Sequence, residues 1–124
     1  MKLDKLDVLF SEVIRRRAIQ RVGGCERCLQ GKVSWKDLQC AHFHGRSKKS
    51  VRWDTDNSAG ICGGCHMYLD GQAVEKVEFF KKLLGEESFD CLQNRARTPA
   101  RFIDRTAIEL YLKQELENLK GGNI

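Results

Sequence analysis

The stretch Cys62-Gly63-Gly64-Cys65-His66 decides the fold, because it repeats a cysteine spacing that first occurs at Cys25-Glu26-Arg27-Cys28. A CxxC turn presents two thiolates to one metal ion, and two such turns supply the four soft ligands that tetrahedral zinc prefers. We therefore predict a structural zinc site at Cys25, Cys28, Cys62 and Cys65. A redox dithiol, the alternative, needs a single CxxC beside a β-α-β pattern, which this sequence lacks.

The two cysteine pairs are separated by 33 residues, more than the roughly 15–20 residues of a plain zinc ribbon. The additional length must house something else, and it contains the segment Cys40-Ala41-His42-Phe43-His44. Cys40 and Cys91 remain outside the two pairs. We expect both to be buried thiols that act as small hydrophobic residues, although either is an alternative zinc ligand.

The charge of the chain favours a polyanionic partner. The 124 residues carry a formal net charge of +5, which a zinc ion held by four thiolates would lower by two. No acidic residue lies between Asp37 and Asp54. Four basic side chains crowd that interval, at Arg46, Lys48, Lys49 and Arg52. We predict that they contact nucleic-acid phosphates; the alternative is an ordinary solvated charge cluster.

The sequence predicts a cytoplasmic protein without a membrane partner. No apolar run approaches the roughly 20 residues of a membrane-spanning helix. The chain opens with Met1-Lys2-Leu3-Asp4, and acidic residues lie where a signal peptide would have its apolar core, so we do not expect export. Six cysteines in a reducing compartment are typical of metal ligands and buried thiols rather than of disulfides.

Hydrophobic periodicity predicts an α+β fold within a single domain, 1–124. An N-terminal helix is expected over 4–20 within segment 1–24. The zinc-containing core, 25–71, should hold a hairpin whose strands are Lys32–Trp35 and Leu38–Phe43, then a turn near Asn57 and a short helix that Gly71 interrupts. Segment 72–124 should form helices over 72–84, 86–96 and 105–119. The apolar stripe of the last helix either folds inward or supplies a homodimer interface.

Three polar residues between and just after the cysteine pairs suggest hydrolytic chemistry: His42, Asn57 and His66. Hydrolysis of a phosphodiester needs a base to activate water and a cation to take up developing charge. A neutral histidine is a suitable base, and a histidine at a helix start is a suitable ligand for a divalent ion. An asparagine amide can bond the backbone beside the base and hold it in place. Each residue alone would be unremarkable, so the combination carries the argument.

These segments resemble the zinc-containing HNH, or ββα-metal, endonucleases. The residues that carry the resemblance are Ala41–Arg46, Arg52–Asn57 and Cys62–His66, and the match covers about residues 25–70. A looser likeness to the phage NinG/Rap recombination proteins extends over most of the chain. It rests on Leu6–Arg15, the Trp35-Lys36-Asp37 turn and the helix that contains Tyr111.

The HNH resemblance implies a ββα-metal core in which His42 is the general base and Asn57 orients it. It implies that His66 binds a catalytic Mg²⁺ or another divalent ion, and that cleavage leaves a 5′-phosphate. Many family members carry an Asp or His metal ligand immediately before the base, where this chain has Ala41. Asp70, four residues after His66, is expected to complete the metal site. It could instead cap the next helix, and His44 is a rival ligand.

The expected function is therefore a divalent-metal-dependent DNA endonuclease. The NinG/Rap likeness implies phage recombination on branched or junction DNA, and two cuts on a junction would favour a homodimer. One alternative is a zinc-dependent DNA-binding module without catalysis, which Ala41 keeps open. Another is an HNH nicking nuclease that acts in phage DNA packaging.

Overall fold

The centre of the fold is a pair of antiparallel strands, β1 (Gln39–His42) and β2 (Ser58–Ile61), in a computed structural model that describes residues 3–121. Gln39 pairs with Ile61 at one end and His42 with Ser58 at the other. Helix α2 (Gly63–Asp70) follows β2 almost without a connection. Together with four further helices, this arrangement confirms the predicted α+β class.

The expected pairing of Lys32–Trp35 with Leu38–Phe43 is wrong. Ser34 instead caps a single 3₁₀ turn over Trp35–Asp37: the Ser34 side chain accepts from the backbone while Asp37 accepts from the Ser34 N–H. This reciprocal capping favours a helical turn over an extended strand. The partner of β1 is β2. The segment that connects them contains Arg46, Lys48, Lys49 and Arg52, and we call it the basic loop. The connection between the paired strands is therefore much longer than periodicity suggested.

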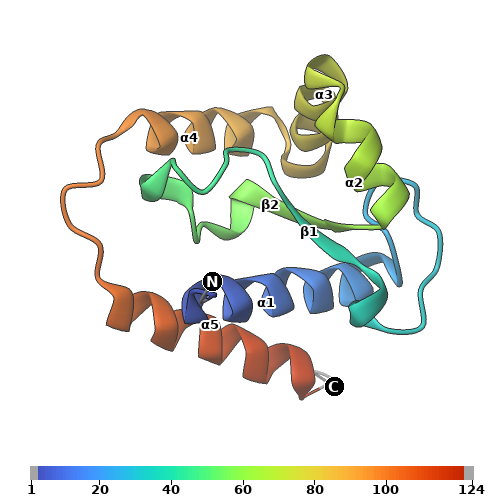
Figure 1. The fold of residues 1–124 in the computed structure, drawn as a ribbon, viewed down its shortest axis with the longest axis horizontal. Helices are drawn as coiled ribbons and strands as arrows, with labels where there is room; N and C mark the ends of the chain where they lie inside the picture. Colours follow the sequence, from blue (N-terminus) through green and yellow to red (C-terminus); the bar gives the residue numbers. More distant parts are fainter. Residues whose placement is uncertain (1–2, 122–124) are drawn as a thin grey trace.

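The four other helices form two layers around the strands (Figure 1). On one side lie α1 (Lys5–Val22) and α5 (Arg105–Lys120), and on the other α3 (Ala73–Leu84) and α4 (Glu86–Arg97). These bounds agree with the predicted helices to within about two residues, the usual uncertainty of helix ends. Asp4 caps α1 by accepting from the Leu6 N–H at 2.8 Å, and Gly23 ends it with a φ of 68°.

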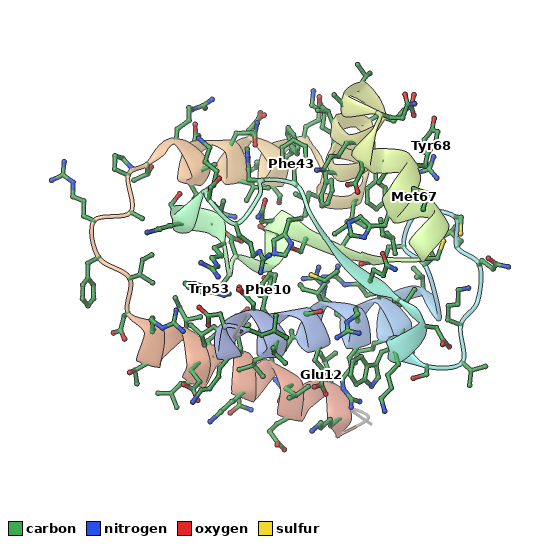
Figure 2. All side chains as sticks on the ribbon, in the orientation of Figure 1. Phe10, Glu12, Phe43, Trp53, Met67 and Tyr68 are labelled. Carbon is green, nitrogen blue, oxygen red and sulfur yellow. The ribbon has the colours of Figure 1, made fainter. Side chains whose placement is uncertain are left out.

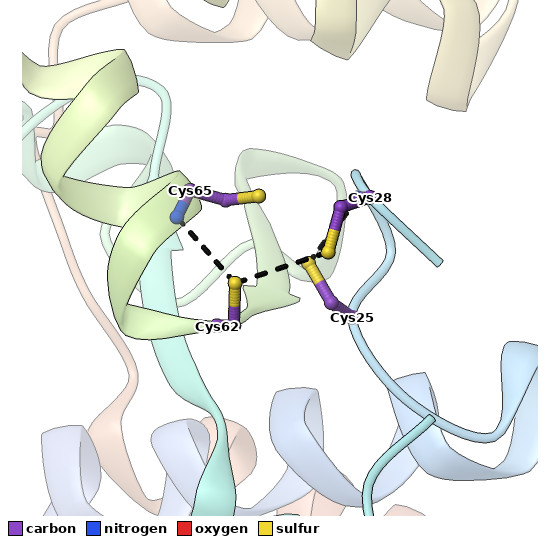
Figure 3. A group of neighbouring side chains, drawn as sticks. All are labelled: Cys25, Cys28, Cys62 and Cys65. Atoms are coloured by element: carbon purple, nitrogen blue, oxygen red, sulfur yellow. Dashed lines mark hydrogen bonds between the residues drawn. The ribbon is translucent and has the colours of Figure 1, made fainter. Parts of the chain in front are cut away.

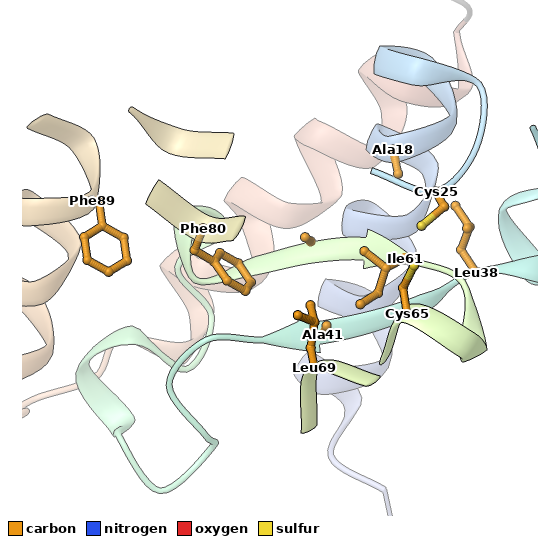
Figure 4. Packing of buried hydrophobic residues seen from close by; sticks show 10 residues of the cluster. Ala18, Cys25, Leu38, Ala41, Ile61, Cys65, Leu69, Phe80 and Phe89 are labelled. Atoms are coloured by element: carbon orange, nitrogen blue, oxygen red, sulfur yellow. The ribbon is translucent and has the colours of Figure 1, made fainter. Parts of the chain in front are cut away.

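The layers meet in one main apolar cluster that spans both faces of the strands (Figure 4). Ala41 and Ile61 supply its centre, Ala18 comes from α1, and Phe80 comes from α3. Helix α1 approaches β2 so closely that a Cβ at Gly60 would lie 2.7 Å from the Ala18 Cβ. Glycine at position 60 therefore allows α1 to pack directly on the sheet.

The apolar stripe of α5 folds inward. Leu112 is fully buried with Phe10, Val13 and Ile14 of α1, and Ile108 packs against the same cluster. The stripe therefore belongs to the core rather than to a free dimer interface. No helix within residues 3–121 has the length and apolar character needed to cross a membrane.

Candidate functional site

The four cysteines of the two CxxC pairs converge at one point (Figure 3). Their Sγ atoms all lie within 4.8 Å of one another. Cys25 and Cys28 come from the turn after α1, whereas Cys62 is the N-cap of α2 and Cys65 lies in its first turn. The predicted ligand cluster is thus assembled, and its spacing and chemistry suit a metal ion such as zinc.

Two cysteines of the cluster differ in how readily they ionise: backbone donors favour the thiolate of Cys25, whereas burial raises the pKa of the Cys65 thiol to about 12. The N–H groups of Arg27 and Cys28 both donate to Cys25 Sγ at 3.4 Å, and Arg27 Nη1 donates to Cys65 Sγ at 3.3 Å. Burial raises the pKa of the Cys25 thiol, but hydrogen bonds from backbone N–H groups outweigh it and lower the pKa to about 7. A thiol that ionises near neutral pH is a good metal ligand.

The two remaining cysteines have different surroundings. Cys40 is half-buried against the α1–α5 cluster, and burial raises the pKa of its thiol to about 11. Cys91 is exposed on α4, so the expectation that it is buried is wrong. Helix α4 directs Phe89 and Leu92 into the core, and Cys91 lies on the other side of the helix.

A second candidate site is a cavity of about 400 Å³ between α1, β1, the start of the basic loop and α2. Two of the three predicted catalytic residues, His42 and His66, line it. Its complete lining is Asp7, Ser11, Cys40, His42, Gly45, Arg46 and His66. Cys40 and His42 reach the same cavity because alternate residues of a strand point to the same side.

His42 combines burial with a free ring nitrogen. Its Nε2 is buried and has no hydrogen-bond partner among the described residues, and its ring lies 5.6 Å from that of Phe10, centroid to centroid. Burial lowers the pKa of His42, the nearby Asp7 charge raises it, and Arg46 lowers it; the net shift is downward. The neutral imidazole that results can accept a proton at neutral pH.

Asn57 is fully buried and holds the backbone two residues beyond His42. Its Oδ1 accepts from the His44 N–H at 2.8 Å, and its Nδ2 donates to the His44 carbonyl at 2.9 Å. Asp54 Oδ1 accepts from the Asp56 N–H, as expected for the Asx turn that precedes it. The Asn57 side-chain amide therefore bonds both the N–H and the carbonyl of His44, just after the end of β1.

His66 occupies the first half of α2 and has one ring nitrogen engaged. Its Nδ1 lies 2.7 Å from Gln39 Oε1, and because that oxygen can only accept, Nδ1 carries the proton. Nε2 is then the acceptor, and it lies 4.0 Å from Asp70 Oδ1 one helical turn later. Asp70 does not cap α3, whose N-cap Gln72 has no side-chain cap hydrogen bond.

The other two positions considered for the metal shell lie elsewhere. His44 Nε2 lies 2.6 Å from Gln93 Oε1 of α4, and His44 does not line the cavity. Strand β1 ends at His42, so the alternation that would have returned His44 to this side no longer holds. Ala41 is 3% exposed and faces the core cluster. A ligand at position 41 would therefore point away from the cavity.

Asp7 is the lining residue that sequence reasoning missed. It accepts from Arg52 Nε at 3.1 Å, from Trp53 Nε1 at 2.9 Å and from Arg46 Nη1 at 3.3 Å. Burial raises the pKa of Asp7, but hydrogen bonds from Arg52 and Trp53 reverse this and leave it lowered. The only hint in the sequence is an acidic residue on the inner side of a helix, a pattern too common to single it out.

The four basic residues of the loop after β1 have different environments. Arg52 is held by Asp7 and Asp4 and packs on the Trp53 ring, with 21% of its side chain exposed. Arg46 has only its Asp7 contact, and 60% of its side chain is exposed. Lys48 and Lys49 are exposed. Three of the four thus present their charge to solvent, while Arg52 ties the loop to α1.

Comparisons with protein-family models, with curated proteins and with solved structures find no significant match to this chain.

Proposed function

We propose that this protein is a divalent-metal-dependent DNA endonuclease of the HNH type, with a structural zinc ion at the four cysteines. The observation that carries the proposal is that both His42 and His66 line one cavity and that, within the described residues, the Nε2 of each ring makes no hydrogen bond. A base without a partner and a metal-binding nitrogen with a fixed tautomer are the two groups that metal-assisted hydrolysis requires.

His42 would act as the general base. Its Nε2 would take a proton from a water molecule as the water oxygen attacks phosphorus, the bond from phosphorus to the 3′ oxygen would break, and the leaving 3′ oxygen would take a proton from solvent. The HNH resemblance implies that the phosphate stays on the 5′ side. Asn57 would keep β1 and the following loop in place through its two bonds to His44, so that the base does not move away from the water.

His66 and Asp70 would hold the divalent ion. Their nearest polar atoms are 4.0 Å apart, one helical turn from each other, and they would supply one imidazole and one carboxylate ligand. Gln39 would act behind them, because its bond to Nδ1 leaves Nε2 free for the metal. Bound there, Mg²⁺ or a similar ion would supply positive charge for the phosphate and the leaving oxygen.

The substrate would be DNA, and the exposed cations beside the cavity support this. Arg46 lines the cavity, and Lys48 and Lys49 follow it on the same loop. Contacts from such side chains to phosphates provide most non-specific affinity. Arg52 would support them indirectly, by fixing the loop through Asp7. The likeness to the NinG/Rap proteins suggests branched DNA from phage recombination as the setting.

One observation favours a second candidate, a zinc-dependent DNA-binding module without catalysis. The only carboxylate that lines the cavity, Asp7, is occupied by three donors, and the ligand position before the base faces the core. In that case the cavity would bind a phosphate and leave it intact.

A cleavage assay separates these functions. The zinc-loaded protein is incubated with supercoiled plasmid, linear duplex and a four-way junction, with Mg²⁺, Mn²⁺ or Ni²⁺. We expect metal-dependent cleavage that leaves 5′-phosphates. The His42→Ala variant is the control and should be inactive. Paired cuts on the junction would support a role in recombination, and a single nick at one duplex site would support packaging. DNA binding without cleavage under all three metals would establish the non-catalytic alternative.

A further inference from the structure

A second and larger cavity, of about 480 Å³, lies beside the proposed active site. It is an open hollow lined by the end of the basic loop, by residues 99–104 between α4 and α5, and by the start of α5. Figure 1 shows this connecting segment as a long arc between the two helical layers. Its apolar lining includes Pro99, Ala100, Ile103 and Ile108. The volume is in the range of small-ligand sites.

The charged groups that line this cavity balance in number, Lys49 and Arg101 against Asp54 and Asp104, but both acids already have partners. Asp54 is paired with Arg95 at 2.6 Å, and Asp104 accepts from the Ala107 N–H as the N-cap of α5. Lys49 and Arg101 are exposed on the rim, and within residues 3–121 neither forms an ion pair. Lys49 and Arg101 are therefore the charged groups that are free to contact the phosphates of a ligand.

The same cavity offers one free aromatic surface. Phe102 is 83% exposed on the connecting segment. Trp53 also lines the cavity, but the guanidinium groups of Arg52 and Arg105 lie 4.8 and 5.1 Å from its ring centroid. Because these cations occupy the Trp53 ring, Phe102 is the side chain on which a planar ligand can stack.

The two cavities share a wall. Trp53 lines the larger one and donates from Nε1 to Asp7 at 2.9 Å, and Asp7 lines the cavity of His42 and His66. Figure 2 places Trp53 between the loop that follows β1 and the layer of α1 and α5. A ligand in the larger cavity would thus lie beside the proposed reaction centre.

We propose that the larger cavity binds unpaired nucleotides of the DNA strand whose phosphodiester enters the His42–His66 cavity. The proposal rests on the proposed function. An exposed aromatic ring and two free cations around an apolar hollow suit a base and its phosphates, and a paired base would not be free to enter. The preferred substrate is accordingly DNA with single-stranded character beside the cleavage site, such as a flap, bubble or junction.

Binding to a short oligothymidylate without added divalent metal tests this proposal apart from catalysis. Anisotropy of the labelled oligonucleotide gives the affinity, with a duplex of the same number of phosphates as competitor. In the Trp35→Phe variant Trp53 is the sole tryptophan, so its fluorescence reports occupancy of the cavity. We expect the oligonucleotide to change this fluorescence more strongly than the duplex does.

The decisive comparison is between two exposed aromatic residues. Phe102→Ala should weaken oligonucleotide binding by about 5- to 100-fold, the usual effect of losing one stacked base. Tyr111→Ala, on α5 outside the cavity lining, should leave it unchanged. Equal effects of the two variants, or equal fluorescence changes with duplex, would overturn the proposal. If only the proposed function is wrong, the protein will not cleave DNA but will still bind the single-stranded oligonucleotide in preference to the duplex.

Discussion

The cysteine cluster and the His42–His66 cavity both use residues at the β1–β2–α2 unit, yet they are assembled in different ways. Each cysteine pair is local: two ligands three residues apart, with sulfurs that accept hydrogen bonds from N–H groups of the same turn. The cavity is non-local. Its walls come from α1, β1, the basic loop and α2, and a carboxylate from the N-terminal helix contacts a tryptophan 46 positions later.

This difference indicates which interactions stabilise each site. The cysteine cluster needs only that two turns meet, and a metal ion bound there would provide the free energy that keeps them together. The histidine cavity is instead formed where four separate segments meet. It relies on packing of α1 against the strands and on hydrogen bonds such as those of Asn57 and Asp7. Loss of a cysteine should therefore affect the fold, and loss of a cavity residue should affect chemistry.

The largest effect is expected at the cysteine cluster. Cys65→Ala should unfold the region around α2, because structural zinc contributes on the order of 10 kcal/mol in small domains, and Cys62→Ser should act similarly. Circular dichroism and zinc quantitation measure the result. Cys91→Ser, at an exposed cysteine outside the cluster, is the matched control and should keep fold and zinc. A folded, metal-free Cys65→Ala protein would show that the cluster is not a structural site.

The next effect is on chemistry alone. His42→Ala should reduce the cleavage rate by about 10²- to 10⁴-fold, the usual cost of removing a general base. Zinc content and DNA affinity should change little. His44→Ala is the control, since His44 bonds Gln93 outside the cavity and its backbone bonds to Asn57 do not need its ring. Similar losses in both variants would contradict the role of His42.

Ala41→Asp distinguishes the two faces of β1. By family resemblance a carboxylate here should tighten metal binding, but Ala41 is buried in the core cluster. The variant should therefore lose about 3 kcal/mol of stability or more, because it buries an unpaired charge. Ala73→Asp, at the exposed start of α3, should be nearly neutral. Urea unfolding compares the two, and a stable Ala41→Asp protein with tighter metal binding would contradict this assignment.

Asp7→Asn tests how α1 contributes to the cavity. The pKa of Asp7 is lowered in the folded protein, so its ionised form contributes stability above the unfolded pKa, and this contribution is lost as pH falls through the folded pKa. The variant should have a free energy of unfolding about 2 kcal/mol lower than wild type at neutral pH. The difference from wild type should shrink below about pH 4. Urea unfolding across pH measures this difference. Asp90→Asn, at an exposed position of α4, is the control and should show no such difference.

The smallest effect is expected at Asp70, whose side chain is 68% exposed. Asp70→Asn should raise the metal concentration for half-maximal cleavage by a few-fold, with Mn²⁺ or Ni²⁺ compensating better than Mg²⁺. Thermal stability should stay the same. A variant with unchanged metal dependence would remove Asp70 from the metal site and leave His66 to bind the ion through water and substrate.

The helices could be predicted from the sequence because their signals are local. Apolar residues recur at helical spacing, and Gly23, Gly71 and Gly85 directly follow three of the helices. Strand pairing could not be predicted in the same way. Lys32–Trp35 looked like a partner for β1 because it is adjacent and alternating, but Ser34 and Asp37 cap a 3₁₀ turn there and β2 takes its place.

Arginines illustrate the same limit. Arg46 and Arg52 look alike in the sequence, as members of one basic loop. Arg52 is nevertheless held by two acidic residues of the α1 region, while Arg46 stays mostly exposed. Arg17 of α1 donates to the carbonyls of Thr55 and Ser58 and supports the start of β2. A side chain's partner depends on which distant segment packs beside it, and a run of charges does not contain that information.

The sequence by itself determined the helices, the cysteine cluster and the candidate residues His42, Asn57 and His66. The helices and the cysteine pairs follow from spacings within a few residues, which backbone geometry converts directly into a turn, a face or a pair of ligands. The three candidate residues follow from their order in the sequence and from the HNH resemblance. Only the tertiary structure decided that Ala41 faces the core, that His44 turns to Gln93 and that Asp7 enters the cavity. Each of these depends on contacts between segments far apart in the chain, and packing of complete helices and strands selects among them.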